Sequence, residues 1–223
     1  MSTSKFGADE PKQSPNRNSP QISAPAALRN REVIAGAIGR FLPNQGSVLE
    51  LASGTGEHIC LFAERFDHLT WQPSEMESSR LDSISAYVSA KSLPNLALPR
   101  YLNVADTDWH ATKADVVIAI NLLHVAPESV LSAVLNGAAQ VLRPGGILLL
   151  YGPFTVNGVF NAESNRHFDA YLREQDTAWG LRDIADLDRI SRTVGLGRLS
   201  LLDMPANNYL VVYELPGLTA RIA

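Results

Sequence analysis

The stretch VLELASGTGEHICLFAERF, from Val48 to Phe66, decides the fold of this 223-residue chain. It begins as an apolar strand, passes through five small residues (Ala52–Gly56, ASGTG), and continues from residue 57 with helical spacing. A turn between a strand and a helix that contains two glycines and no bulky side chain usually lets a ligand lie against bare backbone. The stretch therefore predicts an α/β domain that binds a ligand on its first turn.

Alternating strand and helix patterns surround this turn. A helix is expected over residues 33–42, followed by helices over 57–66, 78–91, 128–142 and 184–194. Strands are expected over residues 47–51, 68–73, 98–104, 114–125, 147–152, 199–205 and 208–214, with a turn at RPGG (143–146). This order predicts a Rossmann-like α/β fold with a doubly wound, mostly parallel seven-stranded sheet and a C-terminal antiparallel hairpin strand.

Composition restricts the classes of protein to which the chain could belong. The net charge is −4, without the basic balance expected of a nucleic-acid binder, and the one cysteine, Cys60, suits a reducing compartment. The apolar runs are too short to cross a bilayer, and the N-terminus has no signal pattern. We expect a cytoplasmic protein that binds neither nucleic acid nor membrane and holds no metal, since no Cys/His cluster has metal spacing. The sequence does not indicate the oligomeric state.

The chain is expected to hold one domain over residues 26–223. Residues 1–25 are rich in Pro, Ser, Asn and Gln, which predicts a flexible tail. An alternative is that the last few of these residues order over a bound ligand as a lid. Residues of about 152–182 are polar, aromatic and irregular, and they predict a cap inserted after the fifth strand.

The turn suits a cationic, phosphate-free ligand better than a dinucleotide. Ile59 stands where a dinucleotide site has its third glycine, and residues 46–64 contain no Lys or Arg. Glu50 is expected to face the ligand's amino-acid end, and Glu75, about 20 residues on, to accept bonds from ribose hydroxyls. S-adenosyl-L-methionine (SAM) has these groups and no phosphate. The alternatives are a solvated strand end for Glu50 and pairing with a helix dipole for Glu75.

The ends of the next two strands complete the predicted cofactor site. Asn103, with its neighbour Val104, is placed to meet the adenine, and Asn121 ends a fully apolar strand. Asn121 could equally cap a turn. The predicted cofactor contacts are therefore Glu50, Ala52, Ser53, Gly54, Thr55, Gly56, Glu75, Asn103, Val104 and Asn121.

The chain resembles the methyltransferase-like 26 family of class I SAM-dependent methyltransferases over about residues 26–214. The matching stretches are RN (29–30), VLELASGTGEH (48–58), WQPSE (71–75), NLLHVAP (121–127), GGILLLYGPF (145–154), SNRHFDAYLREQDTAWGLRD (164–183) and MPANNYLVVYE (204–214). This family usually has Asp where the chain has Glu75 and Asn103. The resemblance implies the class I fold and SAM as cofactor, and it does not define the substrate.

The remaining motifs supply candidates for the chemistry. His124 could be a general base and Tyr151 could orient an acceptor, although a strand-end His is more often structural. Asp169 and Arg173 stand one helical turn apart and could meet a substrate anion or form a surface pair. Asp183 could be a helix N-cap, and the two Asn of the last turn could simply suit that turn. The candidate substrate contacts are Arg29, Asn30, Phe154, Asn165, Asp169, Arg173, Arg182, Asn207 and Asn208.

These observations predict an enzyme that transfers a methyl group from SAM to a small-molecule acceptor. Methyl transfer needs positioning and exclusion of water more than a general base. The alternatives are methylation of a protein or tRNA, and an inactive SAM-binding protein that acts through a partner. A nicotinamide-dependent oxidoreductase is disfavoured by Ile59 and by the missing basic residue. The acceptor atom could be O, N, S or C.

Overall fold

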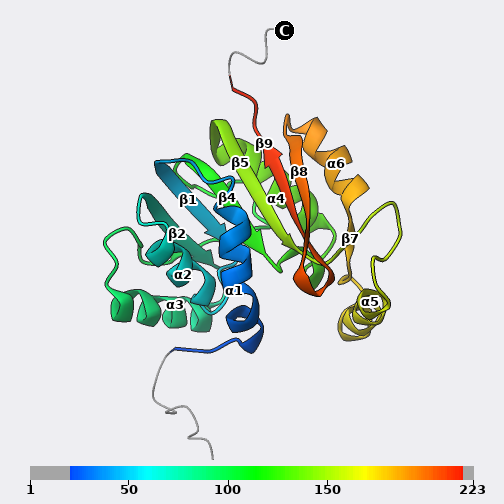
Figure 1. Cartoon of the computed structure of the whole chain (residues 1–223), viewed down its shortest axis with the longest axis horizontal. Coiled ribbons are helices and arrows are strands. Elements are labelled where there is room, and N and C mark those ends of the chain that lie inside the picture. Colours follow the sequence, from blue (N-terminus) through cyan, green and yellow to red (C-terminus); the bar gives the residue numbers. More distant parts are fainter. Residues whose placement is uncertain (1–20, 218–223) are drawn as a thin grey trace, which may run out of the picture.

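The computed structural model describes residues 21–217 and contains the predicted doubly wound sheet (Figure 1). The strand order is β3-β2-β1-β4-β5-β9-β8, in which the first five are parallel and β9 runs antiparallel to both β5 and β8. The strands are β1 (Gly46–Leu51), β2 (Leu69–Glu75), β3 (Arg100–Tyr101), β4 (Ala114–Ile120), β5 (Leu142–Gly152), β8 (Gly197–Met204) and β9 (Asn208–Glu214). The predicted fold class is confirmed.

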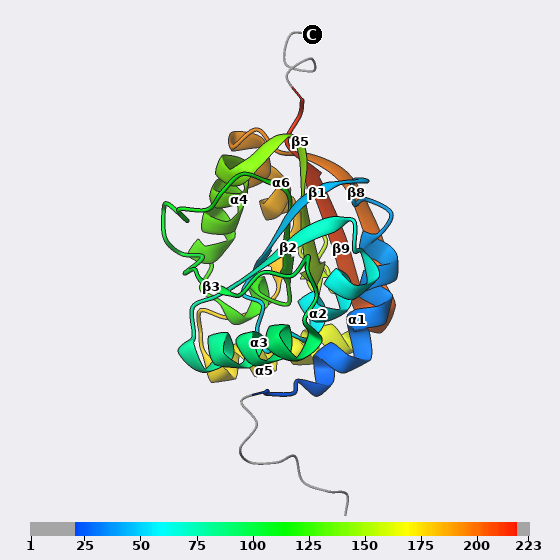
Figure 2. The same ribbon diagram turned by 90° about the vertical axis from the view of Figure 1, so that its left-hand side faces the viewer.

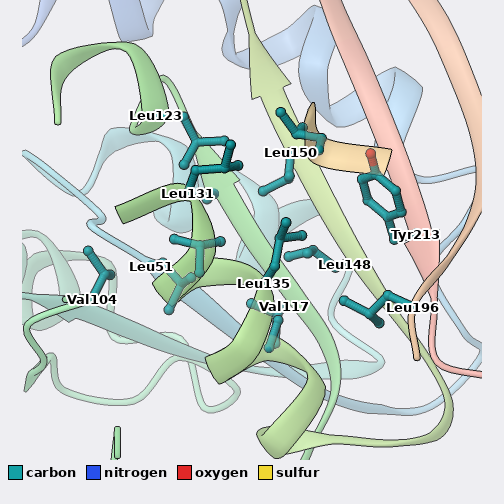
Figure 3. Close-up of a cluster of buried hydrophobic side chains, with 14 of the residues drawn as sticks. Leu51, Val104, Val117, Leu123, Leu131, Leu135, Leu148, Leu150, Leu196 and Tyr213 are labelled. Atoms are coloured by element: carbon teal, nitrogen blue, oxygen red, sulfur yellow. The ribbon is translucent and has the colours of Figure 1, made fainter. Parts of the chain in front are cut away.

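Helices cover both faces of the sheet, as the apolar strands require. One face packs against α1 (Pro25–Ile38), α2 (Glu57–Arg65) and α3 (Ser78–Lys91), through buried residues such as Ile34, Phe62 and Ile84. The other packs against α4 (Ser129–Val141) and α6 (Ile184–Thr193); Figure 3 shows Leu131 and Leu135 of α4 within this second cluster. Alternate residues of β4 enter the two clusters, which is why its sequence is apolar throughout.

The segment after β5 lies beyond one end of the sheet. It contains β6 (Phe154–Thr155), α5 (Glu163–Gln175) and β7 (Arg182–Asp183), and β6 pairs with β7 in a separate two-stranded sheet. Figure 2 shows α5 and the start of α1 at the same end of the molecule. In parallel α/β sheets this carboxyl end is where ligands bind.

Three elements differ from the sequence prediction. The first helix begins at Pro25 rather than near residue 33, because a proline is well suited to a first helical position. The third strand shrinks to two residues. RPGG is part of β5 rather than a turn before it: Leu142 pairs with Ala114, and pairing resumes between Ile147 and Val116 after a shift in register.

Within residues 21–217, none of the helices combines the length and the apolar character needed to cross a bilayer. Residues 1–20 of the predicted tail lie outside the described residues.

Candidate functional site

The turn between β1 and α2 needs glycine at two places for different reasons. Gly54 has a φ of +59°, and a Cβ built on it would meet nothing within 4 Å. Gly56, the N-cap of α2, has a φ of +95°, and its Cβ would lie 3.2 Å from the Ile84 backbone. Gly56 therefore lets α3 pack closely against the turn. Gly54 leaves bare backbone beside open space.

That open space is a pocket of about 560 Å³ at the carboxyl end of β1, here called the cofactor pocket. Its wall comes from the residues before and within the first turn of α1, from the β1 turn, from the start of α3 and from the segment after β4. The lining residues include Ile22, Ser23, Ala24, Ala26, Ala27, Glu50, Ala52, Ser53, Gly54, Thr55, His58, Glu77, Arg80 and Asn121. Of the predicted cofactor residues, the pocket thus brings together Glu50, Asn121 and residues 52–55.

Glu50 is the most perturbed ionisable group of the cofactor pocket. Its side chain is buried, and its Oε2 atom has no hydrogen-bond partner among the described residues. Burial raises the pKa of Glu50 to about 8, the hydrogen bond with Ser53 opposes this shift, and the charge of Glu75 adds to it. A buried carboxyl oxygen without a partner, beside a pocket, is suited to a cationic or hydrogen-bonding ligand.

The other predicted cofactor residues do not line the cofactor pocket. The Glu75 carboxylate accepts hydrogen bonds from the backbone N–H groups of Gly54 (3.0 Å), Met76 (2.8 Å) and Glu77 (3.2 Å). Glu75 therefore fixes the glycine turn in the form described here. Asn103 donates to Asp106 and accepts from the backbone of its own loop, and its neighbour Val104 is part of the core.

A residue that the sequence analysis did not select, Glu57, ties the N-terminal segment over the cofactor pocket. Its buried carboxylate accepts hydrogen bonds from Ser23 Oγ (2.9 Å), Ala24 N (2.9 Å) and Thr55 Oγ1 (3.0 Å). Ile22 N also donates to Ser83 Oγ. The last residues of the predicted tail thus lie in the pocket wall. The sequence signal that could have identified Glu57 is its position: an acidic residue that begins a helix directly after a glycine turn.

A second pocket, of about 760 Å³ and here called the acceptor pocket, adjoins the cofactor pocket. Ala26, Asn121 and Val125 line both. Asn121 adopts a φ of +55° and donates its backbone N–H to the Tyr151 carbonyl, which holds it between the two spaces. The other lining residues of the acceptor pocket are Arg29, Asn30, Val33, His124, Tyr151, Pro153, Ser164, Asn165, Phe168, Pro205, Ala206, Asn207 and Asn208.

Both predicted catalytic residues, His124 and Tyr151, lie in the wall of the acceptor pocket and are buried. Burial, assisted by the charge of Arg182, lowers the pKa of His124 to about 4, so the imidazole is neutral at pH 7. Its ring lies edge-on to Phe168 with centroids 5.6 Å apart. Burial raises the pKa of Tyr151, and its hydroxyl is therefore protonated at neutral pH. Both side chains can exchange hydrogen bonds with a neutral hydroxyl group.

His58, which no sequence pattern singled out, links the two pockets through Asn30. His58 lines the cofactor pocket, and its Nε2 lies 2.9 Å from Asn30 Oδ1. Burial lowers the pKa of His58 to about 4. Asn30 also hydrogen-bonds with the Tyr151 side chain and so opposes the rise in its pKa. The amide of Asn30, a residue of α1, thus contacts one side chain of each pocket. Helix α1 therefore contributes to both pockets.

The amide residues at the far wall of the acceptor pocket hold the hairpin in place. The buried Asn165 donates from Nδ2 to the Asn207 carbonyl (2.8 Å) and to Asn161 Oδ1 (2.8 Å). Asn207 Nδ2 donates to Ser164 Oγ, and Asn208 Nδ2 donates to carbonyls of its own turn. These bonds connect α5 to the turn between β8 and β9.

Four predicted substrate residues lie away from the acceptor pocket. Arg173 and Arg182 line a separate pocket of about 410 Å³, Asp169 binds Arg173 (2.8 Å) and the Leu181 backbone, and Phe154 is in the core. Arg182 is buried and donates to the carbonyls of Leu123, Ala126 and Ala178, so it joins the segment after β4 to the cap. The alternative interpretation of Asp183 is confirmed, because its carboxylate caps α6 at Ala185 N.

Within residues 21–217, no group of three or more His, Cys, Asp or Glu side chains is arranged to hold a metal ion. The described part of the chain therefore offers the two adjoining pockets, and no metal centre, as the candidate active site.

Comparison with known proteins assigns a family and a fold. Residues 21–215 match the model of a family described as protein of unknown function (DUF938). The structure is similar to that of an O-methyltransferase family protein from Burkholderia thailandensis (TM-score 0.73, 18% identity), and the match covers 86% of this chain and 57% of that protein. It is also similar to CalO1, a methyltransferase of calicheamicin biosynthesis in its SAH-bound form (TM-score 0.71, 14% identity; 86% and 54% covered).

A third similar structure is an O-methyltransferase family 2 protein from Planctomyces limnophilus in complex with apigenin (TM-score 0.71, 14% identity; 85% and 59% covered). The chain therefore spans little more than half the length of these proteins. At such low identity the likeness shows a shared Rossmann-like methyltransferase fold.

Proposed function

Because this chain belongs to the DUF938 family of proteins of unknown function, we propose its activity from the geometry of its own site: SAM-dependent transfer of a methyl group to a small-molecule acceptor. One observation carries the proposal. The cofactor pocket at the glycine turn opens beside the acceptor pocket, and the two share Ala26, Asn121 and Val125. A methyl donor in the first and an acceptor in the second would meet at Asn121. The resemblance to the methyltransferase-like 26 family supports the same proposal.

The charge of the cofactor pocket and its bare backbone support SAM as the ligand. Gly54 leaves open space against bare backbone, and the buried Glu50 Oε2 has no partner in the described chain. Glu50 and the turn backbone would hold the amino-acid part of SAM. Glu75 and Asn103 are proposed to hold the ribose and the adenine, and Glu75 would exchange its bond to Gly54 for a ribose hydroxyl. When bound, SAM supplies a methyl group activated on a sulfonium.

The acceptor pocket fits the second half of the reaction. His124, neutral at pH 7, can accept a hydrogen bond from an acceptor hydroxyl, and the Tyr151 hydroxyl can donate one. These bonds would hold the nucleophilic atom toward Asn121 and the cofactor pocket. The proton that the acceptor hydroxyl loses on methylation would pass to His124 or to water. Burial of both side chains limits competing water.

The alternative functions are less well supported. The net charge of −4 does not favour tRNA as a substrate. An inactive SAM-binding protein has no need for two buried hydrogen-bonding side chains beside the cofactor pocket. We place the activity in the cytoplasm.

Calorimetry of the full chain with SAM, S-adenosylhomocysteine (SAH) and NAD tests the proposal. We expect SAM and SAH to bind and NAD not to bind. Gly54→Val should abolish SAH binding, because its side chain enters the cofactor pocket. Gly195→Val is the matched control: Gly195 has a φ of +81° and equally open surroundings, but it lies after α6. NAD binding as tight as SAH binding, or an intact SAH affinity in a folded Gly54→Val protein, would contradict the proposal.

A further inference from the structure

We propose that the acceptor is a small, flat molecule that carries an anionic group, and that Arg29 binds this group at the mouth of the acceptor pocket. This inference rests on the proposed function and goes further by naming the class of acceptor. Three observations support this inference: the position of Arg29, the lack of an opposite charge in the pocket, and the apolar walls of the pocket.

Arg29 is a cation without a partner in the described structure. Among residues 21–217, no acidic side chain forms an ion pair or a hydrogen bond with it, and it lines the acceptor pocket. Arg80, which lines the cofactor pocket, by contrast pairs with Glu77 at 2.9 Å. On α1, Arg29 shares one face with Ala26 and Val33, which are three and four residues away. All three residues line the acceptor pocket, so this exposed face of α1 forms part of the pocket wall.

The rest of the acceptor pocket contains no charge to balance Arg29. No aspartate or glutamate is among its described lining residues, whose polar members are five asparagines, a serine, His124 and Tyr151. His124 and Tyr151 are both neutral at pH 7. A cationic acceptor would face Arg29 and the sulfonium of the cofactor with no carboxylate to stabilise it. An anionic acceptor would find an arginine and several amide donors.

The shape of the walls favours a flat framework. Val33, Pro153, Phe168 and Pro205 contribute apolar surface, and Phe168 is half-buried against the His124 ring. Aromatic rings pack well against such surfaces. A ring between these side chains would present one substituent to His124 and Tyr151 and a second substituent to Arg29, since all three residues line the same pocket. The reacting group and the anionic group are therefore expected to be separate substituents of the acceptor.

Matched acid and amine probes test this inference on the SAH-saturated full chain. The pairs are 4-hydroxyphenylacetate with tyramine and indole-3-acetate with tryptamine, which share a ring and differ in charge. Ligand-observed NMR and calorimetry measure their affinities. We expect each acid to bind roughly ten- to a hundredfold more tightly than its amine, the range typical of one charge-assisted contact. Arg29→Gln should remove most of this preference.

Arg40→Gln is the control, because it removes the same charge beyond the far end of α1. The inference is overturned if the amines bind as tightly as the acids, if the preference persists in Arg29→Gln, or if no probe binds a protein that binds SAH. A protein that fails to bind SAH in the first titration would instead refute the proposed function. The two failures are therefore distinguishable.

Discussion

The buried carboxyl of Glu50 should lower the stability of the ligand-free protein as the pH rises, and Glu50→Gln should remove this effect. Burial raises the pKa of Glu50 from 4.5 to about 8. The folded chain therefore keeps a proton that the unfolded chain loses above pH 4.5. Between pH 4.5 and 8, the free energy of unfolding should fall by about 1.4 kcal/mol for each pH unit. At pH 7 the accumulated cost is roughly 3 kcal/mol.

Two histidines contribute in the opposite direction at lower pH. The pKa values of His58 and His124 are lowered from 6.5 to about 4, so each adds stability that is lost as the pH falls from 6.5 towards 4. Both are neutral in the folded chain above pH 6.5, and in the unfolded chain they finish losing their protons by about pH 7.5. The thiol of Cys60, whose pKa is raised to about 12, matters only above pH 9. The histidine contribution is common to the wild type and Glu50→Gln, so the difference between their free energies of unfolding isolates Glu50 among these groups.

Urea unfolding at pH 6.5, 7.25 and 8.0 is the measurement. Across this interval the wild-type free energy of unfolding should fall by roughly 1.5–2 kcal/mol relative to that of Glu50→Gln. At pH 7 the variant should be more stable by up to roughly 3 kcal/mol, or about 6–12 °C in Tm. The gain should come with a loss of roughly tenfold or more in SAH affinity, because Gln cannot ionise beside a bound ammonium group.

Glu174→Gln is the control, since it removes a carboxylate from an exposed position on α5. Parallel pH profiles for wild type and Glu50→Gln would refute the reasoning, because they would show that Glu50 has the same pKa in the folded and unfolded chains. Unchanged SAH affinity in Glu50→Gln would refute its role in the cofactor pocket.

Three further variants test the assignments made at the cap. Arg173→Ala should cost less than about 1 kcal/mol and leave SAH affinity unchanged, because its side chain is half exposed and pairs with Asp169 outside the acceptor pocket; a tenfold loss of SAH affinity would contradict this placement. Arg182→Met should cost roughly 2–4 kcal/mol in urea unfolding, because it leaves three carbonyls without their buried donor; a cost below about 1 kcal/mol would show that water replaces it. Asn165→Ala should cost roughly 1–3 kcal/mol by releasing the hairpin turn and should leave SAH affinity unchanged; an undisturbed stability would show that the turn holds itself.

The sequence by itself determined the fold and the location of the cofactor pocket. Both depend on relations between neighbours in the chain: an apolar strand, a glycine turn and a helix in succession, repeated with further strands. Strand ends such as Asn121 follow from the same alternation, because the carboxyl ends of parallel strands meet at one edge. His124 and Tyr151 could be selected for this reason, and the structure brings them together in one pocket.

Only the tertiary structure decided which side chains share the acceptor pocket and which lie elsewhere. The spacing of Asp169 and Arg173 predicted their pairing. It could not show that Arg173 lines the pocket beside Arg182 rather than the acceptor pocket. The unpartnered Glu50 oxygen and the shifted pKa values of His58 and His124 depend on burial by α1, α2 and α5, which are distant in the chain. The contacts of Glu57 with Ser23 and Ala24 likewise join segments more than 30 residues apart. Desolvation and long-range packing belong to the folded chain, and no local pattern contains them.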